Sequence, residues 1–238
     1  TTAAGIIFIS LIAGAQNPED KILPRKDFVE SSLDNGLSYV LSHNASPSRM
    51  IECRLIFKAG SILEDESNRG AAHFLEHMAF GGTKHFPNRE LVDYLESLGA
   101  QYGISINAYT GYDRTIYMFA IPSDDREGLD NALRILRDWL VNITLEPKKV
   151  EGEKGIILEE LRGYDVGDEF YDLKIGTGRY SEGIPLGTAE QISAITPEIL
   201  KDFHKKWYTL GQATVAIVGD IDVKDVQKRI RKVFGPLK

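Results

Sequence analysis

The sequence predicts an α+β domain in which a mostly antiparallel sheet carries helices packed on one face. Strand patterns occur in adjacent runs with helices inserted between them, and no steady β–α–β alternation links them. The hydrophobic content of 42% and the charged content of 26% are typical of a globular protein. The sequence shows no internal repeat and no apolar run long enough to span a bilayer, so we expect no stable membrane anchor.

The net charge and the cysteine content limit the partners and the metal ligands that we expect for this protein. The net charge of −7 over 238 residues argues against nucleic-acid binding, because no basic stripe is available for phosphates. Cys53 is the one cysteine of the chain, so it cannot form an intramolecular disulfide, and we expect it to pack in the core. Any metal ion must therefore be held by histidine and carboxylate side chains.

The N-terminal segment has features of an export signal. Ala3 to Ala15 is a small and apolar run that ends in an A-x-A pattern, although the positive residues that should precede it are absent. We expect a signal-like segment at 1–15, a linker at 16–26 and a folded domain at 27–238. The alternative is a disordered or packed apolar segment. The absence of disulfides together with this signal favours export to the bacterial periplasm.

Alternation of apolar and polar residues predicts the first strands. Residues 28–32 and 37–43 alternate around Asp34-Asn35-Gly36, which is a strong hairpin signal. Residues 50–59 predict a further strand. Its inward face consists of Ile51, Cys53, Leu55 and Phe57.

The segment 70–82 predicts a short helix closed by glycines. At about 100° per residue, His73, Glu76 and His77 share one narrow arc. The opposite, buried arc holds Phe74, Leu75, Met78 and Ala79. Two imidazoles four residues apart can reach one metal ion with a carboxylate beside them, which is the inverted zinc-peptidase motif H-x-x-E-H. The alternative is a pair of surface or core histidines on an ordinary helix.

Periodicity predicts the remaining elements in order. We expect helices at 88–98, 124–142, 147–162, 197–207 and 223–234, and strands at 101–110, 112–121 and 213–219. A polar, glycine-rich passage occupies 165–188, and the strand at 213–219 is apolar enough to be central. The other histidines, His43, His85 and His204, show no ligand spacing, and we expect them to be surface or packing residues.

Two histidines leave a zinc site one protein ligand short of the usual three. The helix at 147–162 is rich in glutamate, and on its helical wheel Glu153 and Glu160 lie stacked on one flank of the apolar stripe, beside two isoleucines. A carboxylate partly shielded by isoleucines is costly unless it is paired or binds a metal. We expect Glu160 to be the third ligand and Glu153 its neighbour, with a swap to Glu159 or Glu153 as the alternative. Glu151 and Glu159 are expected to face water.

Several longer blocks accompany these residues. They are NGL at 35–37, KAGS at 58–61, GAAHFLEHMAFGGT at 70–83, NAYTGYDRTIYMF at 107–119, EGEKGIILEELR at 151–162, PLGTAEQI at 185–192 and ATVAIVGDID at 213–222. With them the chain resembles the pitrilysin/insulin-degrading-enzyme family of inverted zinc metallopeptidases, especially its bacterial periplasmic members, over most of the chain after residue 27. In that family the distal glutamate ligand ends an E-x6-E pattern, which here runs from Glu153 to Glu160.

The resemblance implies peptide hydrolysis with one Zn²⁺ per chain on the three ligands named above, and with Glu76 as general base. Glu153 is expected to hydrogen-bond a ligand histidine. An extended peptide substrate is expected to add to the sheet edge at Asn107, Ala108, Tyr109 and Thr110. The alternative is that these four are ordinary strand residues.

The resemblance also implies a partner. The working unit of the family has two homologous halves that close around the substrate, and this chain matches the N-terminal, zinc-binding half. We expect full activity to need a homologous C-terminal half or a partner subunit. Two alternatives are a catalytically inactive peptide-binding or structural subunit of the same fold, and a closed structural metal site that staples two helices.

Overall fold

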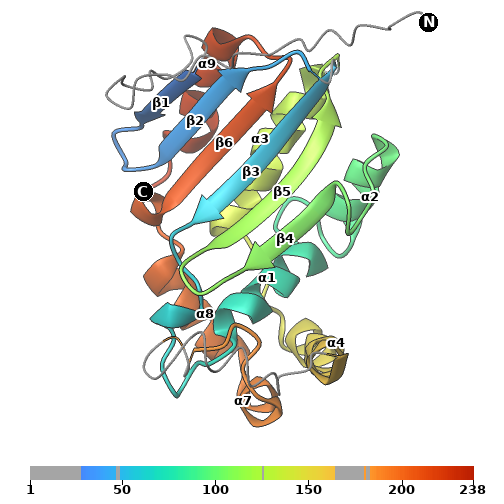
Figure 1. The fold of residues 1–238 in the computed structure, drawn as a ribbon, viewed down its shortest axis with the longest axis vertical. Coiled ribbons are helices and arrows are strands. Elements are labelled where there is room, and N and C mark those ends of the chain that lie inside the picture. Colours follow the sequence, from blue (N-terminus) through green and yellow to red (C-terminus); the bar gives the residue numbers. More distant parts are fainter. Residues whose placement is uncertain (1–27, 47–48, 125, 164–179, 181–182) are drawn as a thin grey trace, which may run out of the picture.

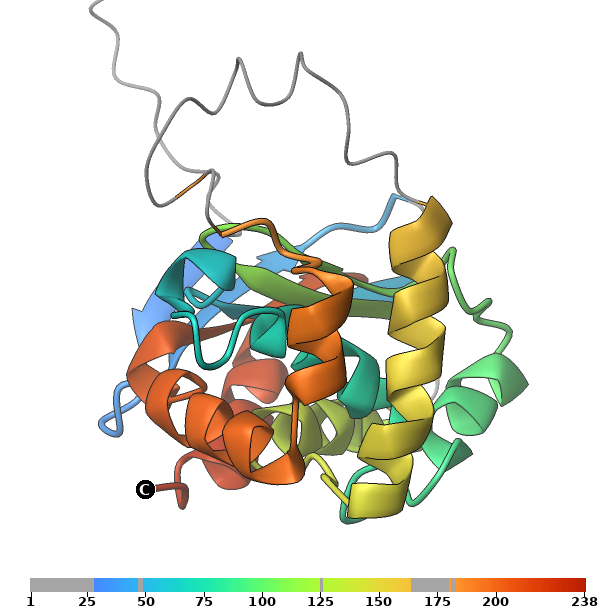
Figure 2. The ribbon, with the colours of Figure 1, turned by 90° about the horizontal axis from the view of Figure 1, so that it is seen from below.

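The chain folds into one six-stranded sheet with its helices gathered on one face (Figures 1 and 2). The computed structural model describes residues 28–46, 49–124, 126–163, 180 and 183–238. The expected signal-like segment 1–15 and linker 16–26 lie outside the described residues. The predicted α+β class is confirmed.

The described elements agree with most of the predicted ones. The strands are β1 (Phe28–Ser32), β2 (Ser38–His43), β3 (Met50–Phe57), β4 (Ile106–Thr110), β5 (Thr115–Pro122) and β6 (Ala213–Gly219). The helices are α1 (Ala71–Gly81), α2 (Glu90–Ser97), α3 (Arg126–Val141), α4 (Pro147–Gly163), α7 (Ala189–Ala194), α8 (Pro197–Trp207) and α9 (Val223–Phe234), with short 3-10 turns η1 (Ser61–Leu63) and η2 (Leu210–Gln212).

The strand order is β1-β2-β6-β3-β5-β4, and β6 lies in the middle of the sheet as predicted. Among the described strands, β2 and β6 form the one parallel pair, and the other neighbours are antiparallel. The register places Cys53 opposite Ile217 on β6 and Leu55 opposite Tyr117 on β5. The strand β4 forms one edge of the sheet.

One face of the sheet makes the core with the helices. The inward side chains of β3 and β6 alternate as the pattern predicts, and Cys53 is fully buried. Trp139 of α3 lies at the centre, where its ring is 5.2 Å from that of Tyr117 and 5.5 Å from that of Phe80 on α1. Its Nε1 donates to the carbonyl of Ala79 at 3.1 Å, so this core residue also fastens α1.

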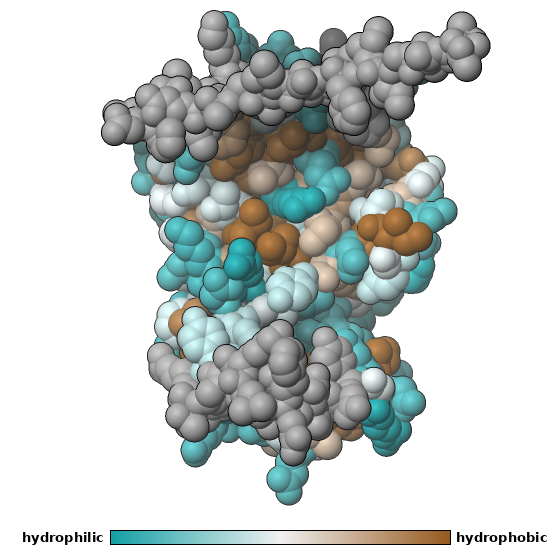
Figure 3. All heavy atoms as spheres, in the orientation of Figure 1, coloured by the Kyte–Doolittle hydropathy of each residue, from teal (hydrophilic) through white to brown (hydrophobic). Residues whose placement is uncertain are grey.

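The other face of the sheet is not covered by described helices, and apolar side chains gather on it (Figure 3). The half-buried residues that the alternation places there include Val40, Ile56, Ile116, Met118, Ala216 and Val218. Glu52 and Arg54 form an exposed ion pair on the same face.

Two segments differ from the prediction. The strand expected at 101–110 begins only at Ile106, because residues 101–105 turn back through Gly103, whose φ of 81° suits a residue without a Cβ. The helix α7 was not predicted. Its start carries a capping box, in which Thr188 and Gln191 each bond the backbone of the other. None of the described helices has the length and hydrophobicity that a membrane span requires.

Candidate metal centre

The helix α1 carries the candidate site on one face and core residues on the other. It runs between Gly70, with φ of 84°, and Gly82, with φ of 137°, and both conformations favour glycine. The predicted inward residues Phe74, Leu75, Met78 and Ala79 are buried. The helix packs against α4, α8 and β4.

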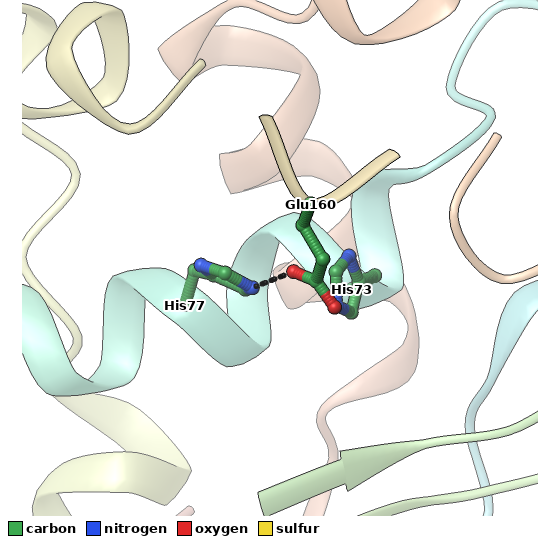
Figure 4. A group of neighbouring side chains, drawn as sticks. All are labelled: His73, His77 and Glu160. Carbon is green, nitrogen blue, oxygen red and sulfur yellow. Dashed lines mark ion pairs between the residues drawn. The ribbon is translucent and has the colours of Figure 1, made fainter. Parts of the chain in front are cut away.

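His73, His77 and Glu160 meet where α1 crosses α4 (Figure 4). One potential ligand atom from each lies within 4.8 Å of the others. His77 Nε2 is 3.2 Å from one oxygen of Glu160, and His73 Nε2 is 3.7 Å from the other. Ligands at zinc-binding distance in a tetrahedral site are separated by about 3.3 Å, so these three side chains fit a Zn²⁺ ion.

The environment of the two imidazoles suits a metal ligand role. His77 Nδ1 is 2.8 Å from Oε1 of Glu153, and this bond leaves Nε2 directed toward Glu160. Burial is the largest influence on His77 and lowers its pKa, but Glu153, Glu160 and Glu76 together outweigh it, so the pKa is raised. Burial lowers the pKa of His73 to about 3, and the neighbouring His77 adds to that shift. His73 is therefore held as a neutral imidazole.

Glu76 lies beside the three potential ligands and outside their cluster. Its Oε2 accepts a short hydrogen bond from Thr110 Oγ1 at the end of β4. Burial raises the pKa of Glu76, while the Thr110 hydroxyl and His77 act against that shift. A carboxylate with a raised pKa takes up a proton more readily than an ordinary glutamate, which is the property of a general base.

Comparisons with known proteins agree with this geometry. Residues 39–170 match the family model described as Insulinase (Peptidase family M16). The chain belongs to this family. Residues 194–238 match the model described as Peptidase M16 inactive domain, and the chain corresponds to the N-terminal part of the larger M16 proteins. The predicted resemblance is confirmed.

Individual M16 relatives carry zinc-protease names. The probable zinc protease PqqL of Haemophilus influenzae is 34% identical over 240 residues, which is 98% of this chain and 26% of that protein. The zinc protease PQQL-like of Arabidopsis thaliana is 36% identical over 208 residues, which is 85% of this chain and 22% of that protein. The crystal structure of the first half of the periplasmic protease PqqL from Escherichia coli superposes with a TM-score of 0.84 at 31% identity, covering 90% of this chain and 47% of that one. The chain thus spans about a quarter of the length of these curated relatives.

The other predicted residues of this M16 chain lie as follows. Asn107 and Tyr109 are exposed on the edge strand β4, Ala108 is half-buried, and Thr110 is buried where it reaches Glu76. Glu151 and Glu159 are exposed, as predicted, and form ion pairs with Lys154 and Arg162.

Isoleucine side chains do not surround Glu160, so this part of the prediction was wrong. Ile156 is 57% exposed and only Ile157 is buried, so isoleucines do not shield the carboxylate of Glu160. Its side chain is 41% exposed and lies near the histidines because α4 crosses α1 at this point. Glu153 and Glu160 share the flank of α4 that the helical wheel predicts, and both contact His77 of α1.

The remaining histidines serve as structural residues. His43 bonds the carbonyl of Ile221, and His85 bonds the buried carboxylate of Asp138. His204 stacks on Tyr208, and burial lowers its pKa to about 4.

Sequence reasoning missed a group of residues that surround the centre. Tyr102 packs edge-on against Phe80, 5.5 Å between ring centres, and lies close enough to Glu76 and Glu153 that their charges raise its pKa, after the larger effect of burial. Glu64 is also missing from the prediction, because it stands in an acidic loop whose other acids face water. Burial of a lone acid in such a loop leaves no periodic signal in the sequence.

Proposed function

We propose that this chain is the zinc-binding part of a metalloendopeptidase that hydrolyses extended peptides. The observation that carries the proposal is the convergence of His73, His77 and Glu160 from two helices, with Glu76 next to them and outside the ligand set. The relatives' names support zinc as the ion and proteolysis as the reaction. Three ligands from the described residues leave a coordination position for water or substrate, as in catalytic rather than structural zinc sites.

Each side chain has a distinct role in the proposed reaction. When bound, zinc supplies Lewis-acid polarisation of the scissile carbonyl and lowers the pKa of a bound water. Glu76 takes the proton of the attacking water and passes it to the leaving amine, and its raised pKa suits both steps. Thr110 holds the Glu76 carboxylate, and Glu153 holds the tautomer of His77.

The edge strand β4 is the proposed place for the substrate backbone. No described strand pairs with its outer side, and its last residue bonds the general base. An extended peptide that pairs with Asn107, Ala108, Tyr109 and Thr110 would therefore run toward Glu76. Main-chain pairing makes few demands on substrate sequence, which suits an enzyme that degrades peptides.

We further propose that a homologous second half, or a partner subunit, completes the enzyme. The support is that the H. influenzae and A. thaliana relatives are about four times as long as the part that this chain matches. Export to the periplasm is proposed from the signal-like segment at 1–15 and from the E. coli relative, which is a periplasmic protease.

The test combines metal analysis with a cleavage assay. We expect the purified chain to bind one Zn²⁺, to cleave a fluorogenic unstructured peptide weakly alone, and to cleave it efficiently when the homologous second half is supplied. Glu76→Gln should retain zinc and lose turnover, whereas Glu159→Gln, an exposed change on α4, should alter neither. Zinc and peptide binding without any cleavage would instead identify an inactive peptide-binding subunit. Failure of the chain to bind zinc would refute the proposal.

A further inference from the structure

The N-terminus of α1 is held by a buried carboxylate from outside the helix. The first N–H groups of a helix have no partner within it, and Gly70 has no side chain with which to cap them. Glu64 supplies the missing acceptors. Its Oε2 accepts from the N–H of Gly70 at 2.9 Å, and its Oε1 accepts from the N–H of Ala72 at 2.8 Å. Since Ala72 directly precedes His73, the two bonds fix the backbone turn that carries this histidine.

These two hydrogen bonds offset the cost of burying the Glu64 carboxylate. Glu64 is only 5% exposed, so its carboxylate has given up water for the two backbone N–H groups. A buried carboxylate is costly unless its oxygens are bonded, and a negative charge at a helix N-terminus is favourable. The next two residues of the same loop, Asp65 and Glu66, are exposed.

The C-terminus of α1 is held by a charge of the opposite sign. Lys149 Nζ donates to the carbonyl of Gly81 at 3.2 Å, four residues after His77. A positive charge is favourable at this end of a helix. Lys149 lies in the first turn of α4, and the same helix carries Glu160 at its other end. This bond therefore sets the position of one ligand-bearing helix relative to the other.

The segment that carries Glu64 is itself attached to the β4–β5 turn. Ser61 N donates to the carbonyl of Gly111 at 3.1 Å, and Ile62 N donates to that of Tyr112 at 2.9 Å. Thr110, at the start of the same turn, bonds the proposed general base. The helix end, its capping segment and the substrate-side strand thus form one connected frame.

We propose that Glu64 and Lys149 are positioning residues of the metal centre, which hold the two ends of α1 so that His73 and His77 meet Glu160 at metal-binding distance. The inference rests on the proposed function, since it takes Zn²⁺ as the ion. Neither residue belongs to the ligand cluster, and both act through the backbone of α1.

The experiment measures Zn²⁺ affinity of the chain by competition with a chromophoric chelator at pH 8. Glu64→Gln keeps the size of the side chain but sets an amide NH₂ against one backbone N–H, and we expect about tenfold or greater weakening. Lys149→Met keeps most of the aliphatic stem, and we expect about threefold weakening. The matched controls are exposed neighbours of the same type, and E66Q and K148M should stay within about twofold of the wild type.

A second readout separates positioning from general stability. The visible absorption of the Co²⁺-loaded chain reports ligand geometry, and we expect E64Q to change the band positions while E66Q does not. Glu64→Asp, which keeps the charge on a shorter stem, should recover part of the affinity. Near-ultraviolet circular dichroism of the metal-free chain shows whether each variant is folded.

The outcomes are distinguishable. If the wild type binds no zinc, the proposed function fails. If the wild type binds zinc and folded E64Q and K149M keep its affinity and its Co²⁺ spectrum, the positioning role is refuted, even if both variants unfold more easily. If E64Q does not fold, E64D and K149M decide in the same way.

Discussion

Replacement of Asp138 should expose how strongly the segment after α1 depends on a single buried carboxylate. Asp138 is fully buried on α3, and its Oδ2 accepts from Thr83 Oγ1 at 2.7 Å and from the N–H of His85 at 3.0 Å. Its Oδ1 accepts from His85 Nδ1 at 2.8 Å and from Asn142 Nδ2 at 2.7 Å. In Asp138→Ala all four donors lose their acceptor.

The expected loss follows from which donors water can reach. The side chains of His85 and Asn142 are partly exposed, so water can replace their bonds. The hydroxyl of Thr83 is buried and the bond of the His85 N–H is part-buried, so water replaces these two bonds less readily. At about 1–3 kcal/mol for each buried donor left without a partner, D138A should lose about 2–6 kcal/mol of unfolding free energy.

A second variant, Asp138→Asn, should destabilise the protein less than Asp138→Ala. The amide oxygen of this asparagine can still accept hydrogen bonds from Thr83 Oγ1 and from the N–H of His85. Its NH₂ then faces the His85 ring and Asn142, which can become acceptors by a change of tautomer and by an amide flip. D138N should therefore cost only about 1–2 kcal/mol.

Urea unfolding of the metal-free chain, followed by tryptophan fluorescence, measures these differences. Asp130→Asn serves as the control, because Asp130 lies on the same helix as Asp138. The change removes a surface ion pair with Arg229 of α9 and should cost less than about 1 kcal/mol. A loss below about 1 kcal/mol for D138A, or equal losses for D138A and D138N, would contradict the assignment of the four bonds.

Three further measurements test the centre itself. Glu153→Ala should weaken Zn²⁺ binding by about 10–100-fold, and Glu153→Gln by less, because an amide oxygen still accepts from His77 Nδ1. Chelator competition measures both affinities. If E153A binds Zn²⁺ as tightly as E159Q, Glu153 does not support the ligand His77. Zn²⁺ at about a thousandfold excess over its Kd should add about 4 kcal/mol to the unfolding free energy, seen as a higher Tm that EDTA reverses, and an unchanged Tm would argue against a folded-state site. Burial raises the pKa of Glu64 from 4.5 to about 7, so the folded chain holds this proton longer than the unfolded chain. The metal-free protein should therefore lose about 3 kcal/mol from this group as pH rises from about 4.5 to 7, and parallel pH–stability curves for the wild type and E64Q would rule this out.

The elements that could be predicted from the sequence are those with a clear local periodicity of apolar residues. The buried arc of α1, the alternation of β3 and the apolar run of β6 each required a single partner surface, and the structure has all three. Residues 101–105 have strand-like composition, yet the turn at Gly103 overrides it. The short helix α7 directly follows the polar passage 165–188 and was not predicted, although the spacing of Thr188 and Gln191 matches a capping box.

The candidate site also contains residues that could be predicted from the sequence and residues that could not. His73, Glu76 and His77 are neighbours on one helix, so their common face could be predicted from the sequence alone. The bond between Glu153 and His77 needed two helices to cross, and the family resemblance supplied what periodicity could only suggest. Glu64 accepts from backbone N–H groups six and eight residues later, and Lys149 donates to a carbonyl 68 residues earlier. Neither contact follows from helix or strand periodicity.

The central place of β6 has a consequence for how the protein is made. Residues 213–219 pair with β2 and β3, so a nascent chain emerging from the ribosome carries α1, α4 and every candidate ligand before its sheet can close. Until then β2 and β3 present unpaired edges, which invite association with other chains. Contacts between such distant segments also slow folding. We therefore expect the chain to become able to bind metal late in folding, when β6 joins the pair β1–β2 to the group β3–β5–β4.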